Sequence, residues 1–497
     1  MSTAPTAGVD DLVHEPIAAL ADRIRHGRLR SVELVESYLS RIEARNPSLN
    51  AIVAFSQTAL KEAAEVDDAV RRGEDPGPMC GIPFTVKDTI LTAGLCTTAG
   101  SVLLKGFIPT ETAPAVRRVQ HAGGILVGKT NTPEFALDLH TDNVLFGATI
   151  NPADPSLTPG GSSGGECAAV SAGLSAFGIG TDFGASLRWP AQCTGVVSLR
   201  PTVGRVPGSG ALPYFSARGV DTTDPDSFFA QTQVVGPIAR TVDDLWLALK
   251  TMSGPDPSDP VSRSVDLGDP AHVVPSDLNC AWFASDATYE PDEDVLAVIR
   301  CAAETLARCG ISITQQRPAA LDRAERVYNQ LRLADNATWM ARLPTNAQGE
   351  RPPFIQAAIE ESRSMSSAAI QSAAAERVLL RSSLERYMMT TPILLTAVSR
   401  KPAFPVTDLT TMPVPSDIVS PCRSIGLFGL PVVSIPFGRS AQGAFISVQV
   451  VGRPFADHQV LAVASLLERY RPPLHRQSLS STTSSKPRTG VTGHADR

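Results

Sequence analysis

Two glycine-rich turns, each carrying serine, have the composition of a nucleophilic active site. They cover residues 160–165 (GGSSGG) and residues 180–186 (GTDFGAS). Glycine lets the backbone approach a ligand closely, and successive N–H groups in such a turn can hold a developing oxyanion. Enough chain separates Ser162 from Ser186 for a turn, a helix over 166–175 and a return to the same cavity. The pattern predicts a serine nucleophile beside an oxyanion-binding turn, and therefore a hydrolase.

The best base for such a serine is Lys87. None of the eight histidines lies in a segment that resembles a catalytic loop. Lys87 lies in the apolar, strand-like run 81–88 (GIPFTVKD), which predicts that it is carried into the interior. Desolvation lowers the pKa of an amine, and a neutral lysine can accept a proton from a hydroxyl. For any single lysine after a strand the ordinary alternative is a solvated or ion-paired residue, with Asp88 as its partner.

These segments together resemble the amidase signature family, which includes fatty acid amide hydrolase, peptide amidase, aryl acylamidases and the A chain of tRNA-dependent amidotransferases. The resemblance rests on the Lys87 segment, the GGSSGG turn and the GTDFGAS…RWPA turn. It covers most of residues 15–255 and returns at about 418–468. It implies a Ser–cisSer–Lys triad in which Ser186 is the nucleophile, Ser162 the bridging serine at a cis peptide bond, and Lys87 the base.

The resemblance also implies an oxyanion hole. Its donors would be the backbone N–H groups of Phe183, Gly184, Ala185 and Ser186. In this scheme Ser186 attacks an amide or ester carbonyl, its proton passes through Ser162 to Lys87, and water later hydrolyses the acyl-enzyme.

Three further residues flank the triad as supporting positions. For Asp182 and Arg188, an ion pair that fixes the turn is expected rather than direct contact with substrate. Ser163 stays open between support of the site and ordinary turn formation.

Two positions depart from the family's usual pattern. Ala185 stands where the family more often has glycine, so its methyl group must be compatible with the oxyanion turn and would narrow the cavity. Residues 426–431 (GLFGLP) lack the asparagine that commonly precedes Gly-Leu-Pro, which leaves one supporting contact open.

Two other motif matches point to different activities. Residues 123–130 (GGILVGKT) match the phosphate-binding pattern GxxxxGK[ST], but Ile-Leu-Val favours a strand and Pro133 follows closely. Residues 160–164 (GGSSG) match the GxSxG pattern of α/β-hydrolases, which requires a preceding strand, whereas residues 151–155 (NPADP) predict a loop. Both alternatives are therefore weaker than the amidase hypothesis.

Composition limits the remaining function classes. The chain has 497 residues, is 43% hydrophobic and carries a net charge of −6, which indicates a globular protein and disfavours a nucleic-acid binder. The eight cysteines show no metal-type spacing, so we expect reduced thiols, no metal and no cofactor. The N-terminus does not resemble a signal peptide and no apolar run is long enough for a membrane span. We expect a cytoplasmic monomer or homodimer that acts on a small-molecule amide, without nucleic-acid or membrane partners.

The resemblance implies an α/β fold class: a single large amidase-signature fold with a central twisted mixed β-sheet flanked by helices on both faces. We expect a flexible N-terminal arm at 1–14 and the amidase domain at 15–470. Within it, residues 255–417 form a variable region that would shape the substrate pocket. Residues 471–497, rich in Ser, Thr, Pro and Arg, predict a disordered tail.

Periodicity and turn signals predict the elements of this domain. The helix over 31–45 would be capped by Ser31 and would bury an apolar stripe. Other expected helices are 16–26, 59–72, 241–252, 292–308 and 457–470, with residues 318–390 largely helical. Expected strands are 49–56, 278–284, 311–315, 431–438 and 445–451. Residues 391–416 contain five prolines and predict a loop.

The leading functional hypothesis is a serine amidohydrolase that cleaves a linear carboxamide, with aryl amides, esters and carbamates (aryl-acylamidase or urethanase activity) within its chemistry. The first alternative is the A chain of a tRNA-dependent amidotransferase, which would need partner proteins; the acidic balance and the divergent middle region speak against it. The second is a catalytically silent relative, which the presence of all three triad positions disfavours.

Overall fold

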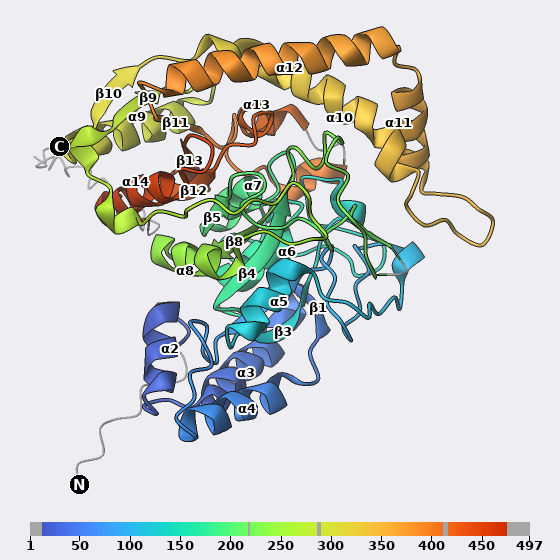
Figure 1. The fold of residues 1–497 in the computed structure, drawn as a ribbon, viewed down its shortest axis with the longest axis vertical. Helices are drawn as coiled ribbons and strands as arrows, with labels where there is room; N and C mark the ends of the chain where they lie inside the picture. Colours follow the sequence, from blue (N-terminus) through green and yellow to red (C-terminus); the bar gives the residue numbers. More distant parts are fainter. Residues whose placement is uncertain (1–11, 217–218, 286–289, 411–415, 475–497) are drawn as a thin grey trace, which may run out of the picture.

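One mixed β-sheet runs through the protein. The computed structural model describes residues 12–216, 219–285, 290–410 and 416–474 (Figure 1). Within these residues eleven strands pair in the order β1-β3-β2-β4-β8-β5-β12-β13-β11-β9-β10. The strands are β1 (Ile52–Phe55), β2 (Pro83–Lys87), β3 (Ile125–Thr130), β4 (Phe177–Asp182), β5 (Val197–Arg200), β8 (Val234–Ala239), β9 (Asn279–Trp282), β10 (Ser312–Gln315), β11 (Ile393–Ala397), β12 (Val432–Arg439) and β13 (Phe445–Val451). A separate short pair is formed by β6 (Phe215–Ser216) and β7 (Gly219–Val220).

The sheet combines parallel and antiparallel pairs. β2 runs parallel to both β3 and β4, and β9 runs parallel to β10 and β11. The pairs that join these two groups through β8, β5, β12 and β13 are antiparallel. Because parallel strands end at the same edge of a sheet, the ends of β2 and β4 bring distant parts of the sequence together.

Helices cover both faces of this sheet (Figure 1). They are α2 (Ile17–Arg25), α3 (Ser31–Leu49), α4 (Ala59–Arg71), α5 (Pro114–His121), α6 (Gly164–Ser171), α7 (Arg188–Thr194), α8 (Val242–Met252), α9 (Glu293–Arg308), α10 (Ala324–Met340), α11 (Pro353–Arg363), α12 (Ser367–Met388), α13 (Ser420–Gly426) and α14 (Asp457–Tyr470).

The side chains of β8 show how the two layers form. Successive residues of a strand point to opposite faces. Val235 and Ala239 belong to the apolar cluster that contains residues of α8, α9 and α14. Val234 and Ile238 belong to a second cluster with residues of α6 and α7. The expected α/β architecture, with helices on both faces of a mixed sheet, is confirmed.

A layer of three helices, α10, α11 and α12, lies at one end of the molecule (Figure 1). Apolar side chains of α10 and α12 pack against α13 and β11, so this layer is fixed to the sheet through residues such as Val327, Leu380 and Ile425. The layer falls within the predicted variable region 255–417. Its helix α10 packs against α13 and also contacts the turn after β4, since the ring centroids of Tyr328 and Phe183 are 5.5 Å apart.

One predicted loop contains a strand. Residues 393–397 (ILLTA) form β11, which pairs with β9 and β13 and is buried throughout. The prolines that suggested a loop lie outside this apolar segment, at 392 and from 402 onward. The remaining predicted helices and strands are present, with ends shifted by a few residues.

The N-terminal predictions need two corrections. Leu12 and Val13 lie in the hydrophobic core, so the end of the predicted arm is packed rather than loose. Ser31 does not cap α3 but is its first residue; the Asp67 carboxylate accepts from the N–H groups of Ser31 and Val32 at 2.6 and 3.1 Å. The predicted apolar stripe of α3 packs into the core.

The two ends of the chain lie largely beyond the described residues. Residues 1–11 of the predicted arm and 475–497 of the predicted tail are outside them. The first tail residues are held: Arg439 Nε donates to the carbonyl oxygen of Leu474 at 2.6 Å. Among the described helices, none has both the length and the apolarity that crossing a bilayer requires.

Candidate active site

Lys87 lies in the interior at the end of β2. The apolar strand carries it there, and its side chain is fully buried. Its Nζ donates to Ser162 Oγ at 2.6 Å and to Thr181 Oγ1 at 2.9 Å. Burial lowers the pKa of Lys87 to about 7, and the nearby Asp182 and Glu166 only partly oppose this shift. Lys87 therefore has access to a neutral form near neutral pH and is in contact with a serine hydroxyl.

Ser162 lies in the GGSSGG turn that leads into α6. The peptide bond between Gly161 and Ser162 is cis, as the resemblance implied. The Ser162 carbonyl accepts from Thr132 Oγ1 at 2.9 Å, and the residue is 1% exposed. The turn is thus anchored on its backbone side while its hydroxyl faces Lys87.

Strand pairing brings the second partner of Lys87 into place. β2 and β4 are parallel neighbours, with Val86 opposite Ile179. Thr181, two residues further along β4, consequently reaches the end of β2, where its hydroxyl meets Lys87.

Ser186 follows β4 in the second glycine-rich turn and is half-buried. Its carbonyl oxygen accepts from the backbone N–H of Ser163 at 3.2 Å, which joins the two turns. Ser163 also donates its hydroxyl to the Thr181 carbonyl at 3.3 Å. Ser163 therefore holds the two turns together through both its backbone and its side chain.

A cavity of about 300 Å³ opens beside Ser186. Phe183, Gly184 and Ala185, the predicted oxyanion residues, line it together with Ser186. The Ala185 methyl group belongs to an apolar cluster with Trp189, so packing in the core accommodates the departure from glycine. The other lining residues come from the segment 136–139 and from α10, η7 (Ser416–Val419) and α13.

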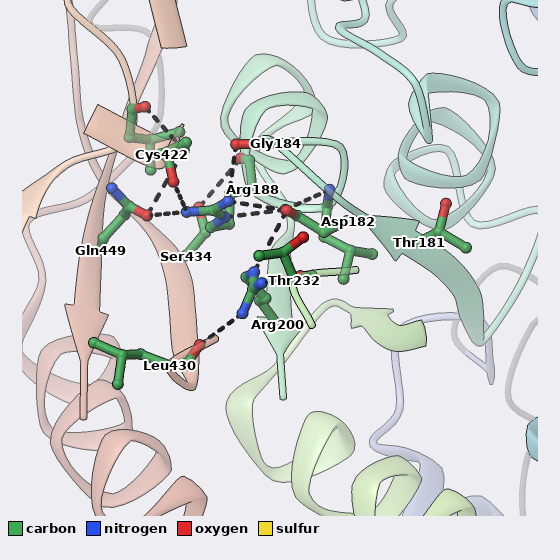
Figure 2. A network of polar contacts seen from close by, with 12 residues as sticks. Thr181, Asp182, Gly184, Arg188, Arg200, Thr232, Cys422, Leu430, Ser434 and Gln449 are labelled. Atoms are coloured by element: carbon green, nitrogen blue, oxygen red, sulfur yellow. Dashed lines mark hydrogen bonds and ion pairs between the residues drawn. The ribbon is translucent and has the colours of Figure 1, made fainter. Parts of the chain in front are cut away.

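Asp182 and Arg188 form a buried ion pair behind the second turn (Figure 2). Arg188 donates through Nε and Nη2 to the Asp182 carboxylate at 3.0 and 2.9 Å, and Nη2 also reaches the carbonyl of Gly184 at 3.0 Å. Burial alone would raise the pKa of Asp182, but Arg188 and Arg200 hold it below its usual value. The pair fixes the turn, as expected, and Figure 2 shows Thr181 pointing to the opposite side of β4.

The same arginine ties this turn to the C-terminal strands. Arg188 Nη1 donates to Gln449 Oε1 of β13 at 2.8 Å and to the carbonyl of Cys422 in α13 at 2.9 Å. A second arginine, Arg200, lies 3.6 Å from Asp182 and donates to the Leu430 carbonyl at 2.8 Å (Figure 2). Segments more than 200 residues apart are thus joined directly behind the candidate nucleophile.

Comparison with known proteins agrees with this geometry. Residues 33–461 match the family model described as Amidase. The chain belongs to the amidase family. The resemblance inferred from the Lys87 and serine-glycine motifs is confirmed.

Curated relatives of this amidase include an amidotransferase chain and a hydrolase. The A chain of the Glutamyl-tRNA(Gln) amidotransferase of Carboxydothermus hydrogenoformans is 30% identical over 483 residues, covering 90% of this chain and 96% of the relative. The Indoleacetamide hydrolase of Bradyrhizobium diazoefficiens is 39% identical over 296 residues, covering 59% of this chain and 55% of the relative.

Solved structures show the same fold. The 6-aminohexanoate cyclic dimer hydrolase complexed with substrate has a TM-score of 0.80 at 25% identity, with 93% of this chain and 98% of that chain covered. A bacterial aryl acylamidase of the amidase signature family has a TM-score of 0.80 at 23% identity, with 92% and 96% covered, which is a likeness of fold alone. Family and relatives together identify the chain as an enzyme that hydrolyses amide C–N bonds.

The structure does not support the alternative interpretations of these motifs: an ion pair between Lys87 and Asp88, a phosphate-binding loop, and an α/β-hydrolase turn. Asp88 accepts from the Thr98 N–H at 3.0 Å and makes no ion pair with Lys87 among the described contacts. The GxxxxGK[ST] match ends in strand β3, where Lys129 is fully buried and its Nζ donates to the Ile90 carbonyl and, at 3.2 Å, to Thr97. The GxSxG match follows an irregular segment rather than a strand.

Sequence reasoning missed several residues of this amidase's site. Thr181 lies within the recognised motif. If β2 and β4 had been predicted to pair, the register of the two strands would have identified Thr181 as a neighbour of Lys87. Glu166 is fully buried beneath the site and accepts from Thr130 at 2.7 Å; burial raises its pKa to about 7. Tyr328 and Arg423, which line the cavity, carry no local signal because they come from the variable region and from α13.

Removing the Asp182 carboxylate is expected to destabilise the amidase strongly. Asp182→Ala leaves Arg188 and Arg200 buried without their counter-charge, which costs about 3–5 kcal/mol in the free energy of unfolding. Urea denaturation measures this difference. The matched control is Glu385→Ala on α12, which breaks an exposed ion pair with Arg381 and should change stability little. Equal stability losses in the two variants would contradict the assigned role of Asp182.

Proposed function

We propose that this amidase cleaves linear carboxamides through an acyl-enzyme on Ser186, with Ser162 relaying the proton to Lys87. The observation that carries the proposal is the 2.6 Å contact between Lys87 Nζ and Ser162 Oγ. Burial lowers the pKa of this lysine to about 7, so its amine has access to the neutral form near neutral pH. An amine with a free lone pair can take the proton of a hydroxyl, whereas a protonated one cannot.

The reaction then follows from the positions of the groups. Ser186 Oγ attacks the amide carbonyl while its proton moves to Ser162 Oγ, and the Ser162 proton moves to Lys87 Nζ. The backbone N–H groups of the turn 183–186 would stabilise the oxyanion, a contribution of about 3 kcal/mol per donor in comparable sites. The same relay returns the proton to the leaving amine, and water hydrolyses the ester by the reverse path.

The test is hydrolysis of a panel by the purified chain alone. The panel contains anilides, aliphatic amides, esters and carbamates, and release of amine or alcohol is measured against the Ser186→Ala variant. Serine-dependent turnover supports a free-standing amidase of the aryl-acylamidase or urethanase type, and the ranking of the panel identifies the substrate class.

The relatives favour a second candidate, the A chain of a tRNA-dependent amidotransferase. Curated relatives that match nearly the whole chain, at about 30% identity, bear this name. Such full-length identity is a stronger argument than the net charge of −6, which disfavoured this candidate. This candidate would be supported if the folded chain alone hydrolysed no member of the panel but showed turnover once the other amidotransferase chains from the same host were added. Full activity of the chain alone would speak against it.

The rate of hydrolysis is expected to rise with pH through about pH 7. Burial lowers the pKa of Lys87 to about 7, so below this pH the lysine is protonated and cannot act as the base. For a single essential base, kcat/KM falls about tenfold for each pH unit below its pKa. The measurement is kcat/KM for a neutral anilide between pH 5 and pH 9. A flat profile over this range would exclude Lys87 as the base.

A further inference from the structure

Two arginine side chains line the cavity beside Ser186. Arg332 comes from α10 and Arg423 from α13. Within the described ranges neither guanidinium group makes an ion pair or a hydrogen bond, and Nε of Arg332 is buried without a partner. The buried arginines elsewhere near the site differ: Arg188 and Arg200 both lie against Asp182.

A third unpartnered group joins them. Tyr328 is fully buried and lines the same cavity, yet its hydroxyl has no hydrogen-bond partner among the described residues. Buried polar groups normally have partners, because leaving one unpaired costs about 1–3 kcal/mol. An exception that faces a cavity is a place where a ligand can supply the missing contact.

These groups lie directly against the candidate oxyanion turn. A Cβ atom added to Gly184 would lie 3.2 Å from Tyr328 Oη and 3.9 Å from Arg423 Nε. The hydroxyl and the guanidinium are therefore immediate neighbours of the backbone that would bind the scissile carbonyl. Burial, together with the like charge of Arg332, lowers the pKa of Arg423, although an arginine stays protonated at neutral pH.

The charges facing these arginines leave a net positive cavity. Asp138 also lines it, but its side chain is exposed and already accepts from the N–H groups of Leu139 and His140. Glu325, on the same helix as Arg332, opposes the lowering of the Arg423 pKa through its charge, but it lies 4.0 Å from Arg400 and is not among the lining residues of the cavity. Among the described lining residues, two guanidinium groups thus face the cavity with only one acid at its margin.

We infer that Arg423, Arg332 and Tyr328 receive a carboxylate carried by the amide substrate. Guanidinium groups bind carboxylates through paired charge-assisted hydrogen bonds, and a tyrosine hydroxyl donates a further bond. This inference rests on the proposed amide hydrolysis and defines its substrate class as an amide with an anionic group near the scissile bond. Phe183, whose ring stacks on Phe229 with centroids 4.0 Å apart, lines the cavity and provides an apolar wall beside these groups.

The test compares anilides that differ in one charge. One pair is glutaranilate against the neutral valeranilide, with the carboxylate on the acyl side. The other is N-butyryl-4-aminobenzoate against N-butyrylaniline, with the carboxylate on the amine side. We expect kcat/KM for the anionic member of one pair to exceed that of its neutral partner by about tenfold or more, mainly through KM.

Substitution of the arginines should remove this preference. Arg423→Met and, independently, Arg332→Met are expected to lower the anionic-to-neutral ratio of kcat/KM by about tenfold. The matched control is Arg326→Met, which replaces an exposed arginine of α10 paired with Glu376 and should keep the ratio. A wild-type enzyme that hydrolyses the neutral anilides without anionic preference, or a ratio insensitive to both substitutions, would overturn the inference while leaving amide hydrolysis intact.

A binding measurement separates this inference from the proposed function. Calorimetry with the folded Ser186→Ala variant should detect binding of the preferred anionic anilide, and the added Arg423→Met substitution should abolish it. If no anilide is hydrolysed but this binding pattern is found, the anion site stands and the proposed reaction fails. Absence of arginine-dependent binding for both anionic anilides would reject the anion site.

Discussion

Replacing Ser186 by alanine is expected to abolish turnover of every amide and ester that the enzyme accepts. The change removes only the hydroxyl that would form the acyl-enzyme, and loss of a serine nucleophile typically lowers kcat by about 10⁴- to 10⁶-fold. The residue is half-buried and its backbone, which accepts from the Ser163 N–H, is unaffected. Steady-state assays on the best substrate of the panel measure the loss, and thermal denaturation shows that the fold is kept.

The matched control for this variant is Ser171→Ala in the same glycine- and serine-rich stretch. The Ser171 hydroxyl donates to the Thr194 carbonyl at 2.9 Å at the end of α6, away from the cavity. This variant should retain activity with a slightly lower stability. Retention of activity in Ser186→Ala, or an equal loss in both variants, would contradict the role of Ser186 as nucleophile.

Replacing Lys87 by methionine is expected to reduce kcat by about 10²- to 10⁴-fold, the usual contribution of a general base. Methionine keeps the unbranched, buried shape of the lysine but has no amine to receive the Ser162 proton. The substitution removes the cost of burying the amine but also takes this partner from the Ser162 and Thr181 hydroxyls, and because the two effects oppose each other the net change in stability should be small. Assays on activated esters and on anilides measure the effect, which should be larger for anilides because their leaving group must be protonated.

Lys129 offers a matched control, since it is an equally buried lysine on the neighbouring strand β3. Its amine donates hydrogen bonds to the Ile90 carbonyl and to Thr97 and lies near Asp88. Lys129→Met should therefore lower the melting temperature but keep most activity at a permissive temperature. The two variants therefore separate catalysis from stability. An enzyme that keeps full activity on anilides without Lys87 would need a different base.

The candidate chemistry could be predicted from the sequence because it lies in short motifs. A lysine that ends an apolar strand, and two glycine-rich turns with serine, are local patterns whose residue types already restrict the backbone. The same local signals predicted most helices and strands, including β2, α8, β13 and α14. They failed at β11, because the neighbouring prolines suggested a loop while burial between β9 and β13 determined the strand.

Only the tertiary structure decided which groups meet. The register of β2 against β4 places Thr181 against Lys87, and Arg188 reaches Gln449 across more than 200 residues of chain. Packing of α10 and α13 over the second turn brings Tyr328 and Arg423 to Gly184. Such contacts depend on long-range packing, which no local spacing encodes. The sequence by itself therefore determined the reaction class of this protein, whereas the surroundings that would select its substrate follow from how distant segments pack.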